Sequence, residues 1–309
     1  MTCKDQPVAD CPENAIRRDV SADVVWHDAS ATWPLLGGRR IGLMGDVHGD
    51  RNHIFRAANM FGRRGIRVII QLGDFGMIWP RRNWPIDLNA LDVFLGDQDQ
   101  TLLFVDGNHE DHPLLETFPV SSTGIRWVGE RIGHLPRGYR AVFSNGIRLA
   151  ALGGANSIDR YRRLEGRDWW AQEQITLADL RVLGEEPVDV LLSHDVPLGV
   201  PSLDRHLASI RDFVPRQGIR YAERGRRMFH EGFVQVRPRL SLAGHYHWHV
   251  DETIEFETES ESFATRVVVL DAQGASRGNC AILNLDDLSV EVIDVEGRPY
   301  LLDHLGVHR

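Results

Sequence analysis

The chain has 309 residues, of which 42% are hydrophobic and 26% are charged, and its formal net charge is −9. This composition fits one large α/β domain or two small ones with a buried core, and it excludes a disordered chain. The negative charge argues against a protein that holds nucleic acid mainly through an extended basic surface, whereas bound divalent ions would still allow a phosphate-bearing substrate.

Residues 1–38 show no sustained periodicity, and we interpret them as a loosely ordered N-terminal extension before a single domain at 39–309. From residue 40 onward, short apolar runs alternate with helical patterns, which predicts a largely parallel sheet covered by helices. The buried strands are expected at 41–44, 68–72, 102–105, 190–192 and 240–242. The helices are expected at about 51–64, 85–95 and 169–183.

The other segments have a more β-like pattern. Residues 125–153 contain a plausible hairpin turn at Asn145 and Gly146, and residues 253–270 and 280–295 alternate like antiparallel strands. No linker or internal repeat divides the chain. The sequence therefore predicts an α/β fold in which two mixed β-sheets stack face to face and helices flank them.

The cysteines and the N-terminal sequence indicate the cellular compartment in which the protein works. Cys3, Cys11 and Cys280 are too few for a disulfide framework in a chain of this length. The N-terminus lacks the apolar stretch of a signal peptide, and no apolar run is long enough to span a membrane. We expect a cytoplasmic protein that does not associate with membranes.

Side chains that bind metal ions follow the ends of the five expected buried strands. In chain order they are Asp46 and His48, Asp74, Asn108, His194, and the pair His245 and His247. Because binding sites of open α/β sheets form outside the carboxyl ends of the strands, these groups are expected to converge. Two carboxylates, one amide oxygen and four imidazoles suit a pair of divalent ions, an arrangement used for cleaving phosphate esters. Each motif alone is common by chance, so the specific signal is the complete ordered set.

In this order the motifs resemble the signature of the calcineurin-like metallophosphoesterase superfamily, and of its bacterial and phage-type members, over roughly residues 40–250. The resemblance implies a four-layer α/β/β/α sandwich with two metal ions. It places one ion between Asp46, His48 and His247 and the other between Asn108, His194 and His245. In the same scheme Asp74 bridges the two ions.

The resemblance also implies hydrolysis by a metal-activated water. His109 follows a ligand position without being a ligand, and we interpret it as the general acid that protonates the leaving group. Glu110 is expected to orient the backbone or His109. The ions are expected to be manganese, with iron, zinc, nickel or cobalt as alternatives, since mixed nitrogen and oxygen ligands admit all of them. The leading substrate hypothesis is a small phosphodiester such as a cyclic nucleotide.

Three other functions are weighed against this one. The first is a phosphomonoesterase or Ser/Thr protein phosphatase, but Asp74 is followed by Phe75 and Gly76 instead of running into the Asp-Arg-Gly continuation of that branch. The second is a non-catalytic scaffold of the same fold, although all seven ligand positions and His109 are filled. The third is a DNA exonuclease, which the acidic balance disfavours.

An arginine-rich segment supplies the substrate-binding candidates. Arg160 and Arg162, with Asn156 nearby, are suited to clamp a phosphate. The equally weighted alternative is a loop whose arginines pair with neighbouring acids. The long stretch 198–237 either forms a lid over the pocket or an ordinary solvated helix.

Overall fold

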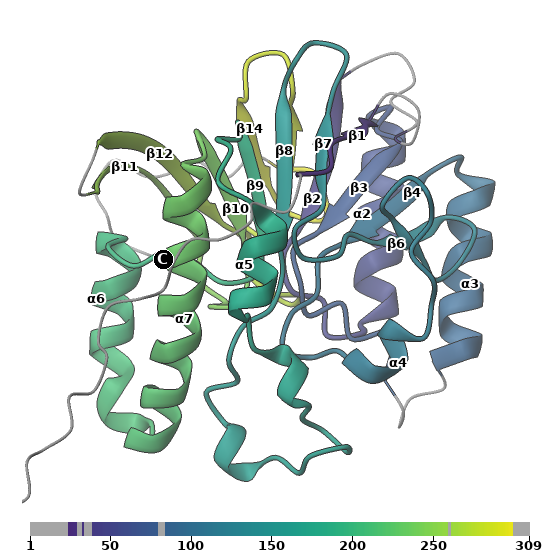
Figure 1. Ribbon diagram of the computed structural model, residues 1–309. Helices are drawn as coiled ribbons and strands as arrows, with labels where there is room; N and C mark the ends of the chain where they lie inside the picture. Colours follow the sequence, from purple (N-terminus) through teal and green to yellow (C-terminus); the bar gives the residue numbers. More distant parts are fainter. Residues whose placement is uncertain (1–23, 30–32, 34–38, 80–83, 259–260, 299–309) are drawn as a thin grey trace, which may run out of the picture.

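The computed structural model describes residues 24–29, 33, 39–79, 84–258 and 261–298. Within this part of the chain, two seven-stranded mixed sheets pack face to face, with helices on their outer faces (Figure 1). The predicted fold class is therefore confirmed.

The first sheet carries the strands that were expected in the N-terminal half. Its spatial order is β14 (Val290–Ile293), β13 (Cys280–Asn284), β2 (Arg40–Met44), β3 (Val68–Gln71), β4 (Thr101–Phe104), β6 (Ile132–His134) and β5 (Arg126–Trp127). The strands β2, β3, β4 and β6 run parallel, whereas β13, β14 and β5 pair antiparallel at the two sides. The parallel centre is buried on both faces, which explains its continuous apolar runs.

The second sheet is parallel at its centre as well. Its order is β1 (His27–Asp28), β7 (Arg140–Val142), β8 (Arg148–Leu152), β9 (Val190–Ser193), β10 (Leu240–Ala243), β12 (Ser262–Val269) and β11 (Val250–Glu257). The antiparallel pair β7 and β8 is joined through the expected turn, where Gly146 has a φ of 84°. The outer strand β11 carries the acidic side chains of Glu252, Glu255 and Glu257.

The helices divide between the two sheets (Figure 1). On the side of the first sheet lie α2 (Arg51–Arg63), α3 (Trp84–Asp97) and the short α4 (His112–Glu116); on the other side lie α5 (Leu177–Leu183), α6 (Pro201–Ile210) and α7 (Arg216–Val236). Single 3₁₀ turns occur at η1 (Arg160–Arg162), η2 (Ala171–Glu173) and η3 (Arg211–Phe213). In the part of the chain that the structure describes, we find no helix that is both long and apolar enough to cross a membrane.

Two expectations about helices need correction. The helix predicted at 169–183 begins only at Leu177, because Thr176 and Asp179 form a capping box that starts it there. The stretch 198–237 contains two helices, where a single solvated helix was one of the alternatives. It forms α6 and α7, and α7 buries Phe229 and Phe233 against the second sheet.

The hydrophobic core has three layers. Between the sheets, side chains such as Leu43 of β2 and Leu192 of β9 interdigitate in one buried cluster. A second cluster joins the first sheet to α2 and α3, and a third joins the second sheet to α5, α6 and α7. The packing of the two sheets fixes the relative position of their strand ends, where the candidate site lies.

Two of the described residues of the expected N-terminal extension, Ala29 and Trp33, belong to the core between the sheets. The strand β1 pairs in parallel with β7. Trp33 is 2% exposed, packs edge-on against Phe143 and donates a hydrogen bond from Nε1 to the Tyr139 hydroxyl at 3.1 Å. The rest of residues 1–38 lies outside the described part, so a domain boundary at residue 38 stays a prediction.

We expect Trp33→Ala to lower the free energy of unfolding by about 3–5 kcal/mol, because it removes a large buried aromatic side chain. The matched control is Val25→Ala in the same segment, where the side chain is 64% exposed and the expected change is within about 0.5 kcal/mol. Urea unfolding followed by circular dichroism measures both. Equal effects of the two variants would contradict the inclusion of Trp33 in the core.

Candidate metal centre

The candidate site lies where strands of the two sheets end side by side. Asp46 follows β2, Asp74 follows β3, Asn108 follows β4, His194 follows β9 and His245 follows β10. All five strands have parallel neighbours, so their carboxyl ends meet at one edge of the sandwich. The seven predicted ligands are joined there into one cluster by the contacts described below.

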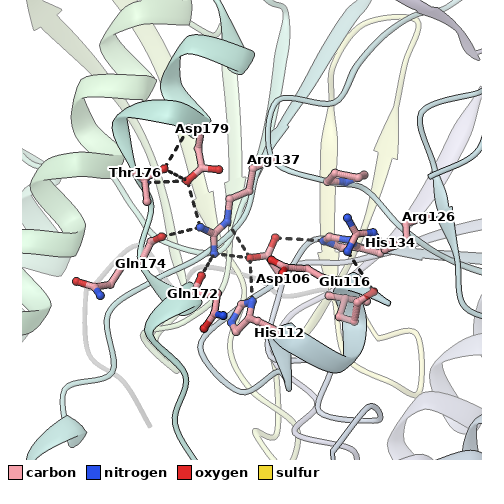
Figure 2. A pocket seen from close by; sticks show the side chains of 12 residues that line it. Asp106, His112, Glu116, Arg126, His134, Arg137, Gln172, Gln174, Thr176 and Asp179 are labelled. Carbon is pink, nitrogen blue, oxygen red and sulfur yellow. Dashed lines mark hydrogen bonds and ion pairs between the residues drawn. The ribbon is translucent and has the colours of Figure 1, made fainter. Parts of the chain in front are cut away.

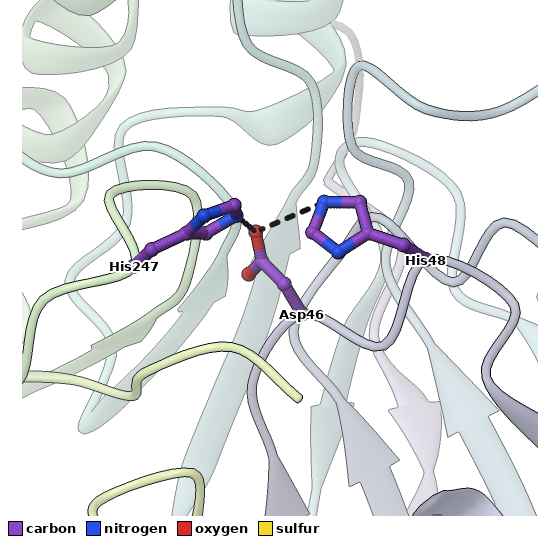
Figure 3. A group of neighbouring side chains, drawn as sticks. All are labelled: Asp46, His48 and His247. Atoms are coloured by element: carbon purple, nitrogen blue, oxygen red, sulfur yellow. Dashed lines mark hydrogen bonds and ion pairs between the residues drawn. The ribbon is translucent and has the colours of Figure 1, made fainter. Parts of the chain in front are cut away.

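The first group is formed by Asp46, His48 and His247 (Figure 3). The Asp46 Oδ2 atom lies 3.0 Å from His247 Nε2 and 3.9 Å from His48 Nε2. The other carboxylate oxygen accepts the backbone N–H of His245 at 2.8 Å. Two imidazoles and one carboxylate oxygen therefore face one point, as a metal with nitrogen and oxygen ligands requires.

The Asp74 carboxylate occupies the centre of the cluster. Its Oδ2 atom lies 3.3 Å from His48 Nε2, and its Oδ1 atom lies 3.2 Å from His194 Nε2. The backbone N–H of His109 donates to Oδ1 at 2.7 Å. One oxygen of this carboxylate thus faces each half of the cluster, which is the arrangement that a bridging ligand needs.

The second group contains His194, Asn108 and His245. The Nδ1–H group of His194 donates to the Leu72 carbonyl at 2.8 Å, which leaves Nε2 to face Asn108 Oδ1 at 3.3 Å. This backbone contact fixes the tautomer that is suited to ligation. The His245 ring packs against the His194 ring, with centroids 4.8 Å apart.

The backbone at the site is strained. Four of the seven predicted ligands have a left-handed backbone, with φ values of 42° at His48, 56° at Asp74, 73° at His245 and 49° at His247. Residues with a side chain adopt this conformation at a cost of about 1–2 kcal/mol each. Such strain clusters at functional sites, where the surrounding structure holds it in place.

The electrostatics of the cluster favour bound cations. Burial alone would lower the pKa of His48, but the hydrogen bond and charge of Asp74 outweigh it and raise that pKa to about 9. Burial is likewise outweighed at His194, whose pKa the charges of Asp74 and Asp46 raise to about 10. Positive charge beside the buried carboxylates of Asp46 and Asp74 is therefore stabilising, and divalent ions held by the same atoms would supply it. The residues present fit a metal centre.

Glu110 links the segments that follow β3 and β4 through hydrogen bonds. Its carboxylate accepts the backbone N–H groups of Gly107 at 2.7 Å and Gly76 at 3.2 Å. Burial, followed by the charge of Asp74, raises the pKa of Glu110 to about 8. Glu110 orients the backbone between Asp74 and Asn108, one of the two roles considered from the sequence.

His109 lies at the rim of the cluster, with its side chain 33% exposed. Its Nε2 atom is 3.9 Å from Asp74 Oδ2 and 2.8 Å from Nη2 of Arg163. The Trp79 ring lies beside it with a centroid distance of 6.1 Å. Burial lowers the pKa of His109 to about 4.

Sequence reasoning missed two residues that contact the cluster. Gln273, from the loop after β12, accepts a hydrogen bond from His48 Nδ1 at 2.8 Å, and no motif pointed to it. Arg163 stood in the arginine-rich segment, but its neighbours were chosen instead. The sequence shows that this segment is rich in arginine, but only the structure shows which arginine faces the cluster.

The predicted substrate contacts have other neighbours in this structure. The Arg160 guanidinium lies 3.5 Å from the centroid of the Trp169 ring, and that of Arg162 lies 5.1 Å from the Tyr161 ring. The buried Asn156 donates to the carbonyl of Tyr221 in α7 at 2.8 Å. The structure does not join these three residues to the metal cluster by any contact among the described side chains, and their role in substrate binding stays a prediction.

A cavity of about 280 Å³ lies next to the site, behind the end of β4. Its wall contains Asp106, whose carboxylate accepts hydrogen bonds from Nε and Nη2 of Arg137 at 2.9 and 2.7 Å (Figure 2). The carbonyl of Asp106 accepts the N–H of Gly154 at 2.7 Å. This network anchors the chain after β8 to the strand end that carries Asn108. None of the seven predicted ligands lines the cavity.

Comparison with known proteins gives one family and one curated relative. The family model described as calcineurin-like phosphoesterase matches residues 39–249. A lariat debranching enzyme from Schizosaccharomyces pombe is 26% identical over 235 residues, which cover 67% of this chain and 48% of that protein. The chain thus spans about half the length of this relative. A solved structure aligns with 83% of this chain and 99% of its own at 12% identity, with a TM-score of 0.47, a level that carries no functional argument.

We expect Gly107→Ala to weaken metal binding by about tenfold or more, because a Cβ atom at this position would collide with the carboxylate and backbone of Asp74. The matched control is Gly96→Ala in α3, where an added Cβ meets nothing within 4 Å and metal binding should be unchanged. Titration calorimetry with Mn²⁺ measures both affinities. Wild-type affinity in Gly107→Ala would show that the close approach to Asp74 is unimportant.

Proposed function

This chain belongs to the calcineurin-like phosphoesterase family, and from that premise we propose that it is a dinuclear metal-dependent phosphodiesterase acting on small phosphodiesters such as cyclic nucleotides. The observation that carries the proposal is the Asp74 carboxylate, with one oxygen 3.3 Å from His48 and the other 3.2 Å from His194. The family description and a relative named a lariat debranching enzyme support hydrolysis of a phosphate ester.

In this proposal one ion would be held by Asp46, His48 and His247, and the other by Asn108, His194 and His245. Asp74 would serve both. Such an ion pair supplies an activated water and positive charge for the oxygens of the phosphate. We propose manganese, and the donor set also admits iron, zinc, nickel or cobalt. We further propose that the enzyme works in the cytoplasm; the buried Cys280 is a free thiol, in keeping with a reducing compartment.

His109 is the residue of this chain that we assign to proton transfer. Its backbone N–H is fixed to Asp74, while its ring reaches the solvent-exposed rim, so the ring faces the space that a substrate would enter. Burial holds the pKa of His109 low, and the negative charge of a bound phosphate acts in the opposite direction, because it stabilises the imidazolium. His109 would then protonate the leaving oxygen.

The segment after Asp74 supports a diesterase over a Ser/Thr protein phosphatase. Phe75, Met77 and Ile78 are buried in the cluster beneath α2 and α3. The arginine-containing continuation of the phosphatase branch therefore has no counterpart in this segment.

The substrate class is tested with the manganese-loaded protein on bis-p-nitrophenyl phosphate, p-nitrophenyl phosphate, and 2′,3′- and 3′,5′-cyclic nucleotides. We expect rapid diester turnover and little monoester turnover. The reverse pattern would favour a phosphomonoesterase, and an absence of turnover with every metal tried would favour a scaffold.

We expect His109→Ala to reduce turnover of a cyclic nucleotide by about 10²–10⁴-fold, because the alkoxide leaving group needs a proton. Nitrophenolate leaves without one, so turnover of bis-p-nitrophenyl phosphate by the same variant serves as the internal control and should fall much less. Measured kcat values for both substrates decide the matter. Equal losses would exclude His109 as the general acid.

A further inference from the structure

A short arm of the chain, residues 157–170, brings one arginine to the edge of the metal cluster. The arm contains the 3₁₀ turn η1, and Arg163 follows that turn with an extended backbone, at φ −97° and ψ 152°. This change of direction sends the side chain of Arg163 toward His109, and its Nη2 atom lies 2.8 Å from His109 Nε2.

The direction of this hydrogen bond is fixed by the chemistry of the two groups. A guanidinium group carries donors and no acceptor, so His109 Nε2 must accept the hydrogen bond with its lone pair. The same nitrogen also lies 3.9 Å from Asp74 Oδ2. While Arg163 occupies it, Nε2 cannot present a proton to a leaving group.

Two residues of the arm contact the Arg163 guanidinium on the side away from His109. The Nε atom of Arg163 lies 2.7 Å from Asp159 Oδ1, an ion pair without the alignment of a hydrogen bond. The Nη1 atom lies 3.5 Å from the carbonyl of Asp168, and the side chain is only 11% exposed. With Nε and Nη1 directed at the arm, Nη2 is the end that faces the site.

We propose that Arg163 is a substrate-binding residue whose Nη2 group leaves His109 Nε2 and binds a non-bridging phosphate oxygen of the incoming phosphate ester. This inference rests on the proposed function and deepens it. Hydrogen bonds from a guanidinium to a phosphate oxygen are charge-assisted and stronger than those to a neutral imidazole. The exchange is therefore favourable when a phosphate reaches the cluster.

Because of this exchange, His109 becomes available for proton donation only after a substrate has bound. Once Arg163 has turned to the phosphate, Nε2 of His109 is free to face the leaving oxygen. Arg160 and Arg162 cannot replace Arg163 in this role without leaving the rings of Trp169 and Tyr161.

The test compares the wild type with Arg163→Gln, which keeps a hydrogen-bonding group without charge, and Arg163→Lys, which keeps the charge without the planar fork. Arg167→Gln is the matched control, because it removes an exposed arginine of the same arm. Two quantities are measured on the manganese-loaded proteins: the Kd of inorganic phosphate by calorimetry, and kcat and KM for bis-p-nitrophenyl phosphate. Circular dichroism establishes that each variant is folded.

For Arg163→Gln we expect Kd for phosphate and KM for the diester to rise by about 10- to 100-fold, the effect of losing a hydrogen bond to a charged group. Arg163→Lys should lose less, and Arg167→Gln should match the wild type. Wild-type phosphate affinity in both Arg163 variants, or equal losses in Arg167→Gln, would overturn the assignment. Phosphate binding is measured independently of turnover, so a wild type that binds phosphate without hydrolysing any ester would refute the proposed function and leave the role of Arg163 to be decided by Kd alone.

Discussion

The structure of the site depends on one buried carboxylate that serves two groups of ligands. Asp74 lies at the end of β3, in the middle of the parallel part of the first sheet, and it contacts histidines that follow β2 and β9. The contact to His194 crosses from one sheet to the other, so it exists only while the sheets are packed. Disturbing the packing between the sheets would divide both groups of ligands, because His247 follows β10 of the second sheet and Asn108 follows β4 of the first.

Close packing at the strand ends makes this geometry possible. Gly107 leaves no room for a side chain beside Asp74, and Gly244 leaves none beside Asp46. Four ligands are held in left-handed backbone conformations. Among them, the N–H of His48 donates to the Asp74 carbonyl at 2.9 Å, and the N–H of His245 donates to Asp46 Oδ1 at 2.8 Å. The ligands are thus positioned by the scaffold, and binding of ions would require little rearrangement of the chain.

Much of this arrangement could be predicted from the sequence, because its signals are local. Each ligand stands just after an apolar run, and parallel strands place their carboxyl ends together, so the convergence of Asp46, Asp74 and Asn108 at one edge of the first sheet could be expected from the pattern. The approach of His194 depends in addition on the packing of the second sheet against the first. The contact of Gln273 with His48 could not be predicted, since Gln273 lies in the loop after β12 and belongs to no recognisable motif. The choice of Arg163 over Arg160 and Arg162 could not be predicted either, because a single 3₁₀ turn decides which side chain faces the site.

The outer strand β11 has a consequence for the behaviour of the protein at high concentration. An open strand at the side of a sheet offers unpaired backbone groups to any extended chain, including that of another copy. On β11 the side chains of Glu252, Glu255 and Glu257 flank those groups, and two such strands would bring like charges into register. Polymerisation by edge-to-edge pairing is thereby opposed along β11, and more strongly in dilute buffer than in concentrated salt.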